Sequence, residues 1–489
     1  MSEETWHQAR LIPTSGINGA EEQERRVTSA LLAVMTSVRE YGRSITKQLG
    51  APAGTIETFI EVPFELGEQR LYPDGLIRVS RGKTRWTALV EVKTGTNELG
   101  VQQLENYLDI ARANGFDAVL TVSNQIPGVA GHHPTPVDKR KLRKVEIHHL
   151  SWSRLLVEAV MQKEYRGVAD PDQAWILGEL IRYLEHPKSG ALQFSDMGES
   201  WVPVREGISS GTLRPTDRGL SDVAARWDAL LQFASLELGR DLGQEVCPVL
   251  SRKEVSDPVF RIQNVSEQLT STGTLAGVIK IPHAAGPIVV TADLRSGQVT
   301  CHIDISAPEE GRSTTRVNWL MRQLGDANDS LRIEAFLAHA RGPSAAELLG
   351  TVKKDPSILV QDPKRELKSF RVATSSKLGP KRGRGRGSFI DSVLGAVNDF
   401  YRDVVQHLKA WRAAPPKMRQ LPTADVEPSS LSSTALSSQD GPEEQGPNAP
   451  EHASPLSSPA DHMPQDQDQS PATPDSASRN DSVSTVSLT

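Results

Sequence analysis

The chain has 489 residues, a formal net charge of −6 and two cysteines. This length exceeds what one compact hydrophobic core serves, so we expect two or more domains. Cys247 and Cys301 cannot build a disulfide framework and do not stand in a metal-type spacing, which suits a reducing cytoplasm. The chain has no apolar run of about 18 residues to span a bilayer, and its N-terminus "MSEETWHQAR" lacks the apolar stretch of a signal peptide. These features predict a soluble cytoplasmic protein with no membrane partner.

The negative charge is concentrated at the C-terminal end. Residues 413–489 hold 11 Asp or Glu against 3 Lys or Arg, so residues 1–412 carry a net charge of about +2. The acidic balance of the whole chain therefore does not argue against a nucleic-acid partner. Residues 413–489 are also rich in Ser and Pro and contain no Phe, Tyr or Trp. Because such a segment cannot bury enough apolar surface to offset its conformational entropy, we expect a disordered acidic tail.

Residues 20–205 have the pattern of an α/β domain, preceded by an N-terminal extension at 1–19. In chain order the expected elements are an amphipathic helix at 21–49, strands at 55–66, 71–80 and 86–94, a helix at 97–115, strands at 116–124 and 145–152, and a helix that starts at Ser151. Glycine at the C′ position commonly ends a helix, so Gly115 is the expected stop of the helix that begins at 97.

A second domain is expected after "EGISSGTLRPTDR" at 206–218, whose Gly, Ser and Pro content predicts a linker. Residues 219–412 are expected to form an α+β domain of unknown role. Its expected elements are a helix at 221–238, an antiparallel meander at 276–282, 286–294 and 298–306, a helix at 316–324, a strand at 331–338 and a helix at 388–411. The chain has no repeat of fixed period.

Two acidic residues and a lysine stand out in the stretch "YPDGLIRVSRGKTRWTALVEVKTG". Side chains alternate between the faces of a strand, so Glu91 and Lys93 share one face. If the strands pair as a hairpin, Asp74 lies next to Glu91. Two carboxylates that close repel each other, and a divalent cation between them resolves the repulsion. Oxygen ligands suit Mg²⁺, or Mn²⁺ in its place, and a bound metal would activate water beside a phosphodiester. Lys93 would either orient this water or stabilise the charge of the phosphate in the transition state.

The following helix adds two polar side chains. Gln103 and Tyr107 are four residues apart and therefore share a helix face. We expect Gln103 to bind the attacking water or a phosphate oxygen, with Tyr107 as its support.

This ordered set of motifs resembles the PD-(D/E)XK nuclease superfamily over about residues 20–165, and the helix pair is similar to its RecB-type Gln-x-x-x-Tyr branch. The residues that carry the resemblance are Asp74 after Pro73, Glu91 and Lys93 in the next strand, and Gln103 and Tyr107 in the helix. The resemblance implies a restriction-endonuclease-like fold, with a mixed four-stranded sheet sandwiched by helices. It also implies Mg²⁺ held by Asp74, Glu91 and the main-chain carbonyl of Val92. Many members carry a further Glu, and the candidates here stay open: Glu21, Glu22, Glu24, Glu57 and Glu61.

Other motifs are weaker. A second Glu-x-Lys, at Glu366 and Lys368, stands in a polar run without a matching hairpin, and we interpret it as a solvated face. Two basic runs are candidate phosphate contacts, with plain charged surface loops as the alternative. They comprise Lys139, Arg140 and Lys141, and Lys381, Arg382, Arg384 and Arg386. The adjacent histidine pairs at 132–133 and 148–149 lack metal-site spacing, so we expect structural or surface roles.

The sequence therefore predicts a metal-dependent nuclease that hydrolyses phosphodiester bonds of DNA. The alternative from another class is a catalytically inactive module of the same fold that binds DNA or a protein partner. The sequence leaves open whether the substrate is DNA or RNA and whether the action is that of an endonuclease or an exonuclease. It also leaves open whether the process is defence or repair, and whether the chain is a monomer or a homodimer.

Overall fold

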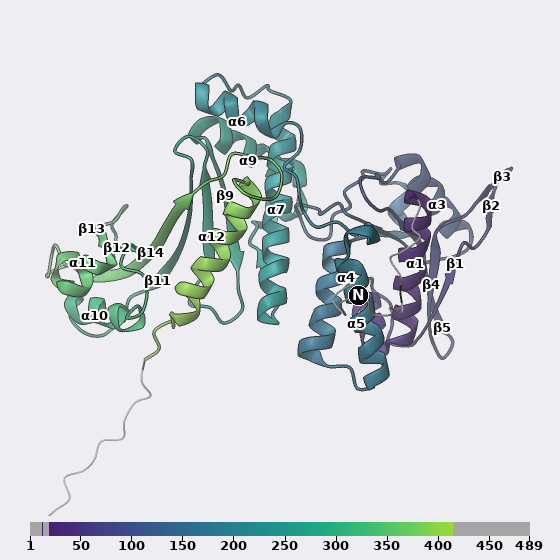
Figure 1. The fold of residues 1–489 in the computed structure, drawn as a ribbon, viewed down its shortest axis with the longest axis horizontal. Helices are drawn as coiled ribbons and strands as arrows, with labels where there is room; N and C mark the ends of the chain where they lie inside the picture. The colour runs from purple at the N-terminus through teal and green to yellow at the C-terminus, as the bar shows by residue number, and fades with distance from the viewer. Residues whose placement is uncertain (1–11, 13–18, 414–489) are drawn as a thin grey trace, which may run out of the picture. The chain divides into compact units, whose positions relative to one another are not determined.

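The structure is a computed structural model that describes residue 12 and residues 19–413 (Figure 1). The described residues have a mixed α/β architecture with two large sheets. The tail expected at 413–489 and the extension expected at 1–19 fall almost wholly outside the described residues. Within the described part of the chain, no helix is long and apolar enough to cross a membrane.

The first sheet is mixed and has the strand order β1-β4-β5-β6-β7. Its strands are β1 Thr55–Ile60, β4 Gly75–Arg81, β5 Thr84–Val92, β6 Ala118–Ser123 and β7 Glu146–Ser151. The first three pair antiparallel, whereas β5, β6 and β7 run parallel. The strands β2 Phe64–Leu66 and β3 Gln69–Leu71 form a separate two-stranded ribbon. The expected mixed sheet is present, with five strands where the resemblance implied four.

Helices cover both faces of this sheet. On one face α1 Ala20–Ser37 runs along β1 and β4 (Figure 1), and its core continues into α2 Arg39–Gln48, α4 Trp152–Val160 and α5 Pro171–Glu185. On the other face α3 Val101–Ala113 packs through Tyr107 and Leu108 onto Leu89 and Val119. The alternation predicted for β5 is observed, because Val90 belongs to the first of these cores and Leu89 to the second. Glu91 therefore projects on the α3 side.

The helix expected at 21–49 is divided into two helices at Val38, whose backbone is extended. Gly42 explains the division, because a Cβ there would collide with the carbonyl oxygen of Met35. Only a residue without a side chain lets α2 fold back this closely on α1. The predicted end of α3 is confirmed, since Gly115 follows the cap residue Asn114 with a left-handed φ of 67°.

The second sheet has seven strands, all antiparallel, in the order β13-β12-β14-β11-β10-β9-β8. Its strands are β8 Cys247–Pro248, β9 Thr274–Lys280, β10 Ile288–Asp293, β11 Gln298–Ser306, β12 Arg332–Leu337, β13 Ala345–Leu348 and β14 Leu367–Lys377. The helices α7 Gly219–Leu242 and α12 Phe389–Asp403 pack on this sheet (Figure 1). The other helices of this part are α8 Arg252–Ser256, α9 Pro258–Thr272, α10 Ser313–Gln323 and α11 Leu349–Lys354. The predicted meander of β9, β10 and β11 is observed.

The segment expected to be a linker at 206–218 differs from the expectation. Helix α6 Trp201–Ser210 occupies its first residues, and the buried Ile208 belongs to the core of the second sheet. That core already includes Phe194. The spacing of Trp201, Val204 and Ile208 places three apolar side chains on one helix face, and their packing overrides the low helix propensity of Gly and Ser.

The strand β14 was not predicted, although it lies in the middle of the second sheet. Its first residue, Leu367, is buried between exposed neighbours. Glu366 accepts a hydrogen bond from Arg316 at 3.1 Å, and Lys368 is exposed. The second Glu-x-Lys therefore lies at the start of an antiparallel core strand, in which Leu367 is buried, while Glu366 and Lys368 are exposed as interpreted.

Candidate active site

Asp74 and Glu91 meet where β4 begins and β5 ends. Gly75 pairs with Val90 in the antiparallel register, so the residues one step outward, Asp74 and Glu91, lie side by side. The Asp74 Oδ2 accepts a hydrogen bond from the Val92 amide at 2.7 Å. Gly75 also makes room for α1, because a Cβ at this position would lie 2.5 Å from a methyl carbon of Leu32. The hairpin register thus brings the two predicted carboxylates together.

Glu91 is the most enclosed member of the site, with 1% of its surface exposed. Its Oε1 accepts a hydrogen bond from Gln103 Nε2 at 2.7 Å and forms an ion pair with Lys93 Nζ at 2.8 Å. Its Oε2 is buried without a hydrogen-bond partner. A buried acceptor left in this state is unfavourable unless a further group binds it.

Helix α3 supplies the next layer of contacts. Gln103 Nε2 also lies 3.2 Å from the Tyr107 hydroxyl, and that hydroxyl donates to the Tyr72 carbonyl at 3.4 Å. Tyr107 supports Gln103, as the sequence predicts. The amide of Gln103 donates to Glu91, and its expected contact with a water or a phosphate oxygen stays a prediction.

Glu24 on α1 is the acidic residue that reaches Lys93. Its Oε2 lies 3.4 Å from Lys93 Nζ, and its Oε1 accepts from the Thr94 amide at 3.2 Å and from Asn97 Nδ2 at 2.7 Å. The other candidates behave differently. Glu22 pairs with Arg26, Glu21 and Glu61 pair with Arg25, and Glu57 is exposed on β1. Of the five acidic candidates that the sequence left open, Glu24 is the one that contacts Lys93.

The electrostatics follow from this crowding of charges. Burial, and then the charge of Asp74, raise the pKa of Glu91 to about 7. Burial also raises the pKa of Asp74, against the hydrogen bond from Val92 and the charge of Lys93. Burial lowers the pKa of Lys93, but the charges of Glu91, Glu24 and Asp74 outweigh this effect and hold the pKa above its ordinary value. The lysine is therefore a firmly protonated cation between carboxylates.

Three residues that the sequence analysis did not select hold the main chain around Lys93. Trp152 Nε1 donates to the Lys93 carbonyl at 2.9 Å. Asn124 Nδ2 donates to the carbonyls of Gly95 at 2.9 Å and Gly190 at 2.8 Å. Gly190 has a φ of 80°, and a Cβ there would lie 2.6 Å from that of Thr94. A lone Asn after a strand gives no signal of this kind, because its partners are distant in sequence.

An open cleft of about 380 Å³ lies beside Asp74. It is lined by Glu21, Glu24, Arg25, Thr28, Ile60, Glu61, Tyr72 and Asp74. In the described part of the chain, no group of three or more His, Cys, Asp or Glu side chains is arranged to hold a metal ion. A donor set of two carboxylates and the Val92 carbonyl still suits Mg²⁺, which keeps several waters. The unpartnered Glu91 Oε2 is the observation that fits such a cation.

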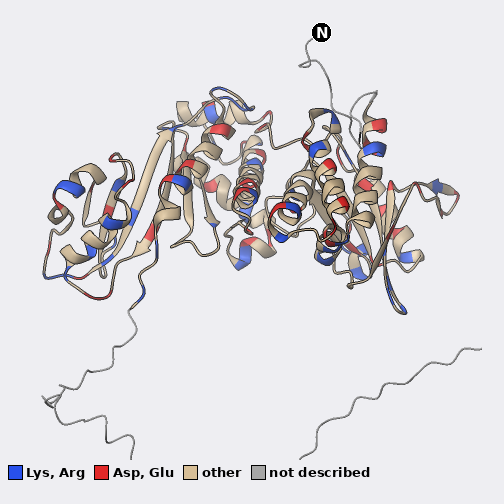
Figure 2. Cartoon of the chain, turned by 60° about the horizontal axis from the view of Figure 1, so that its bottom comes forward, with Lys and Arg blue, Asp and Glu red and all other residues tan. Residues whose placement is uncertain are grey.

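The predicted basic runs are partly neutralised by acidic neighbours. Basic and acidic residues are interspersed over the described elements (Figure 2). In the first run Lys141 pairs with Asp109 at 2.5 Å and Arg140 with Asp138 at 3.1 Å, while Lys139 is exposed. In the second, Arg382 pairs with Asp196 at 3.3 Å and Arg384 with Asp391, while Lys381 and Arg386 are exposed. Their contact with phosphate stays a prediction.

One histidine of each adjacent pair, His133 and His149, belongs to a polar cluster around the buried Thr121. The Thr121 hydroxyl lies 2.8 Å from His133 Nε2 and 2.9 Å from His149 Nδ1. His149 Nε2 lies 2.9 Å from the Gln125 carbonyl. Both imidazoles are satisfied by protein partners, which agrees with the predicted structural role.

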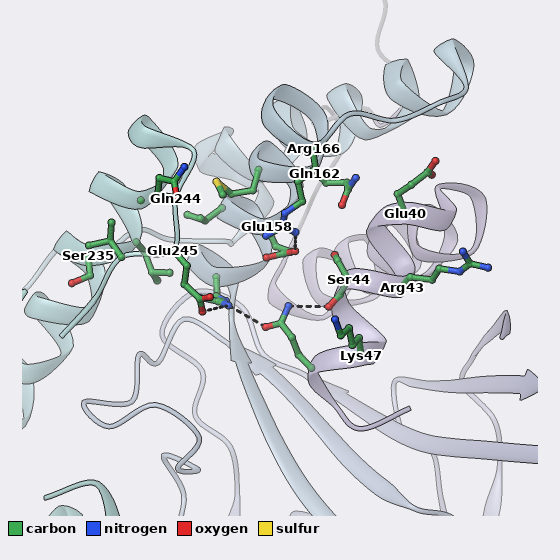
Figure 3. Close-up of a pocket in the computed structure, with 17 residues that line it drawn as sticks. Glu40, Arg43, Ser44, Lys47, Glu158, Gln162, Arg166, Ser235, Gln244 and Glu245 are labelled. Carbon is green, nitrogen blue, oxygen red and sulfur yellow. Dashed lines mark hydrogen bonds and ion pairs between the residues drawn. The ribbon is translucent and has the colours of Figure 1, made fainter. Parts of the chain in front are cut away.

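A larger cavity of about 670 Å³ is walled by α2, α4, α7 and the π-helix η3 Met161–Arg166 (Figure 3). It contains none of the predicted site residues. Two ion pairs lie in its wall, Arg154 with Glu245 and Arg166 with Glu158, and Arg154 also donates to Gln48.

Comparison of the chain with protein-family models, with curated proteins and with solved structures finds no match.

Proposed function

We propose that the chain is a metal-dependent nuclease of the PD-(D/E)XK type that hydrolyses DNA phosphodiester bonds. The observation that carries the proposal is the buried Glu91 carboxylate, which is bound on one oxygen by Lys93 and Gln103, has its other oxygen unpartnered, and lies beside Asp74. A site that only stabilised the fold would gain from a partner for this second oxygen as well. Two adjacent carboxylates, of which that of Asp74 lines an open cleft, support a cation-binding role.

The residues divide the work in the proposed reaction. Asp74, Glu91 and the Val92 carbonyl would hold Mg²⁺, which supplies an activated water and neutralises phosphate charge. Lys93 stays protonated and can stabilise the negative charge that develops on the phosphate oxygens. Gln103 orients Glu91 through its amide, and Glu24 holds Lys93 on the opposite side. Tyr107 fixes Gln103 and is tied to the main chain at Tyr72.

The test is digestion of double-stranded, single-stranded, circular and RNA substrates by the full chain with Mg²⁺ or Mn²⁺. We expect metal-dependent cleavage that falls at least a hundredfold in Asp74→Ala and Lys93→Ala. The second Glu-x-Lys offers a matched control, since the exposed Lys368→Ala variant removes the same side chain elsewhere and is expected to cleave normally. Equal cleavage by Lys93→Ala and wild type contradicts the proposal.

The inactive-module alternative draws on one observation, the absence of a three-donor metal cluster among residues 12 and 19–413. It predicts DNA or protein binding that does not change on removal of divalent ions, with no cleavage of any substrate. Binding of that kind would replace the nuclease proposal.

A further inference from the structure

The cleft beside Asp74 has one cationic side chain among its lining residues. Four carboxylates line it, those of Glu21, Glu24, Glu61 and Asp74, and the only lining cation is Arg25. Arg25 Nε binds Glu61 Oε1 at 2.7 Å, and its terminal nitrogen lies 3.7 Å from Glu21. The Arg25 side chain is 60% exposed and that of Glu61 is 51% exposed. The guanidinium therefore stands at the solvent side of the cleft, bound by a carboxylate.

Glu61 is held in a conformation that few residues with side chains adopt. Its φ is +51°, in the left-handed region that favours glycine. It follows the last residue of β1, and its amide donates to the Asp74 carbonyl at 3.3 Å. The backbone of Glu61, the partner of Arg25, is thus hydrogen-bonded to Asp74, which we assign to the metal. Strained backbone conformations of this kind cluster at functional sites.

Lys93 is not available for a first contact with substrate. It lies 2.8 Å from Glu91 and 3.4 Å from Glu24, and it is largely enclosed. A polyanion that enters an acidic cleft needs a cation to bind, and Arg25 is the exposed one. A guanidinium donates hydrogen bonds to carboxylate and phosphate oxygens in the same planar geometry, so one anion can replace the other.

We infer that Arg25 is the phosphate-binding residue of this cleft, and that the Glu61 carboxylate occupies the guanidinium until a substrate phosphate displaces it. The inference deepens the proposed nuclease function and rests on it. An exposed ion pair of this type changes an equilibrium constant by about fivefold at most. Displacement of Glu61 from Arg25 therefore lowers the affinity for a phosphate only slightly. A weakly charged ligand does not displace the carboxylate and is bound less well.

The test is binding of a fluorescent 30-base-pair duplex and of its single strand by the full chain, in EDTA and in Ca²⁺, at several salt concentrations. We expect Arg25→Ala to weaken binding by about tenfold and to reduce the slope of log K against log salt by about one phosphate contact. Glu61→Gln is expected to tighten binding by about two- to fivefold. Thermal unfolding of each variant verifies that the chain is folded.

A double variant separates displacement from simple charge removal. If Glu61 acts by occupying Arg25, the gain from Glu61→Gln disappears in the Arg25→Ala background. Glu57→Gln removes an exposed carboxylate from the same strand, and Arg112→Ala removes an exposed, ion-paired arginine from α3, so both serve as controls with wild-type binding.

Three results would overturn the inference. These are wild-type affinity and salt slope in Arg25→Ala, no gain in Glu61→Gln, or the same gain in both backgrounds. If the wild-type chain cleaves DNA and one of these results is obtained, only the role of Arg25 is wrong. If the wild-type chain neither binds nor cleaves any nucleic acid, the proposed function is wrong and the inference falls with it.

Discussion

The indole of Trp152 donates a hydrogen bond to the main-chain carbonyl of Lys93, with 2.9 Å between the two atoms. Trp152 is the first residue of α4, is 1% exposed, and belongs to the core between α1 and the first sheet. The main chain of the proposed catalytic lysine is therefore attached to the hydrophobic core between α1 and the first sheet. A site held by rigid elements keeps its geometry better than one on a free loop.

Replacement of Trp152 by Phe tests this attachment. The variant keeps most of the apolar packing but loses the indole donor, so we expect a loss of about 1–3 kcal/mol in the free energy of unfolding. Under the nuclease proposal, cleavage falls further than stability accounts for. Urea denaturation and single-turnover cleavage below the unfolding range measure the two effects. Unchanged cleavage in a destabilised variant would show that the bond serves the fold alone.

Asn124 gives a second test of positioning. Its amide joins Gly95 to Gly190, and its Oδ1 accepts from the Leu192 amide at 2.7 Å. Asn124→Asp removes both donated bonds at constant size, and we expect faster hydrogen exchange at residues 188–192 and about tenfold slower cleavage. Asn114→Ala is the control, since it removes one similar bond from Asn114 Nδ2 to Ile110 at the end of α3. Equal effects of the two substitutions would contradict a special role for Asn124.

The buried histidine cluster predicts acid sensitivity. Burial is the main cause that lowers the pKa of His149 to about 4, with a further contribution from His133. The folded chain thus keeps this imidazole neutral, whereas the unfolded chain protonates it below about pH 6.5. The stability contribution is complete above that pH and is lost as the pH falls toward 4, by about 3 kcal/mol.

His149→Gln removes this titration, so the difference in unfolding free energy between wild type and variant should shrink between pH 7 and pH 4. His148→Gln is the matched control, because it makes the same substitution at the neighbouring residue, which pairs with Glu146 at 3.0 Å. Parallel pH profiles for wild type and His149→Gln would refute the assignment.

A buried ion pair fixes α9 to α7 beside the second sheet. Arg261 donates to both oxygens of Asp228, at 2.8 and 3.0 Å, and to Glu254 at 3.0 Å. Asp228 is 4% exposed, and burial raises its pKa against the effect of Arg261. Arg261→Met leaves this carboxylate buried and unpaired, which we expect to cost about 3–5 kcal/mol.

The matched comparison is Arg371→Ala, which removes a more exposed pair with Asp304 at 2.7 Å and should cost less than about 1 kcal/mol. The double variant Arg261→Met, Asp228→Leu should recover part of the lost stability, because the buried Asp228 charge is removed while Glu254 still lacks Arg261. Calorimetric unfolding ranks the variants. A larger loss for Arg371→Ala than for Arg261→Met would contradict the argument.

Local pattern predicted the parts of the site that depend on neighbours in sequence. The alternation along β5 placed Glu91 and Lys93 on one face, and helical spacing placed Gln103 next to Tyr107. Both arrangements are observed. The hairpin register that sets Asp74 beside Glu91 was also accessible, since both strands are close in sequence.

The remaining contacts join segments far apart in the chain, and pattern alone does not reach them. Glu24 contacts Thr94 across 70 residues, and Asn124 contacts Gly190 across 66 residues. The choice among the five acidic candidates required the packing of α1 on the sheet. The same limit explains the unpredicted strand β14, whose place between β11 and β12 is set by partners from other parts of the chain.

Gly190 constrains what this surface can become by mutation. Its left-handed backbone would strain any residue with a side chain, and a Cβ at this position would also meet Gln23 and Thr94. A library randomised at position 190 should consequently return glycine alone among active clones, whereas the exposed position 188 should accept many residues. The loop beside Thr94 should thus tolerate substitution at its exposed position 188 and require glycine at its buried position 190.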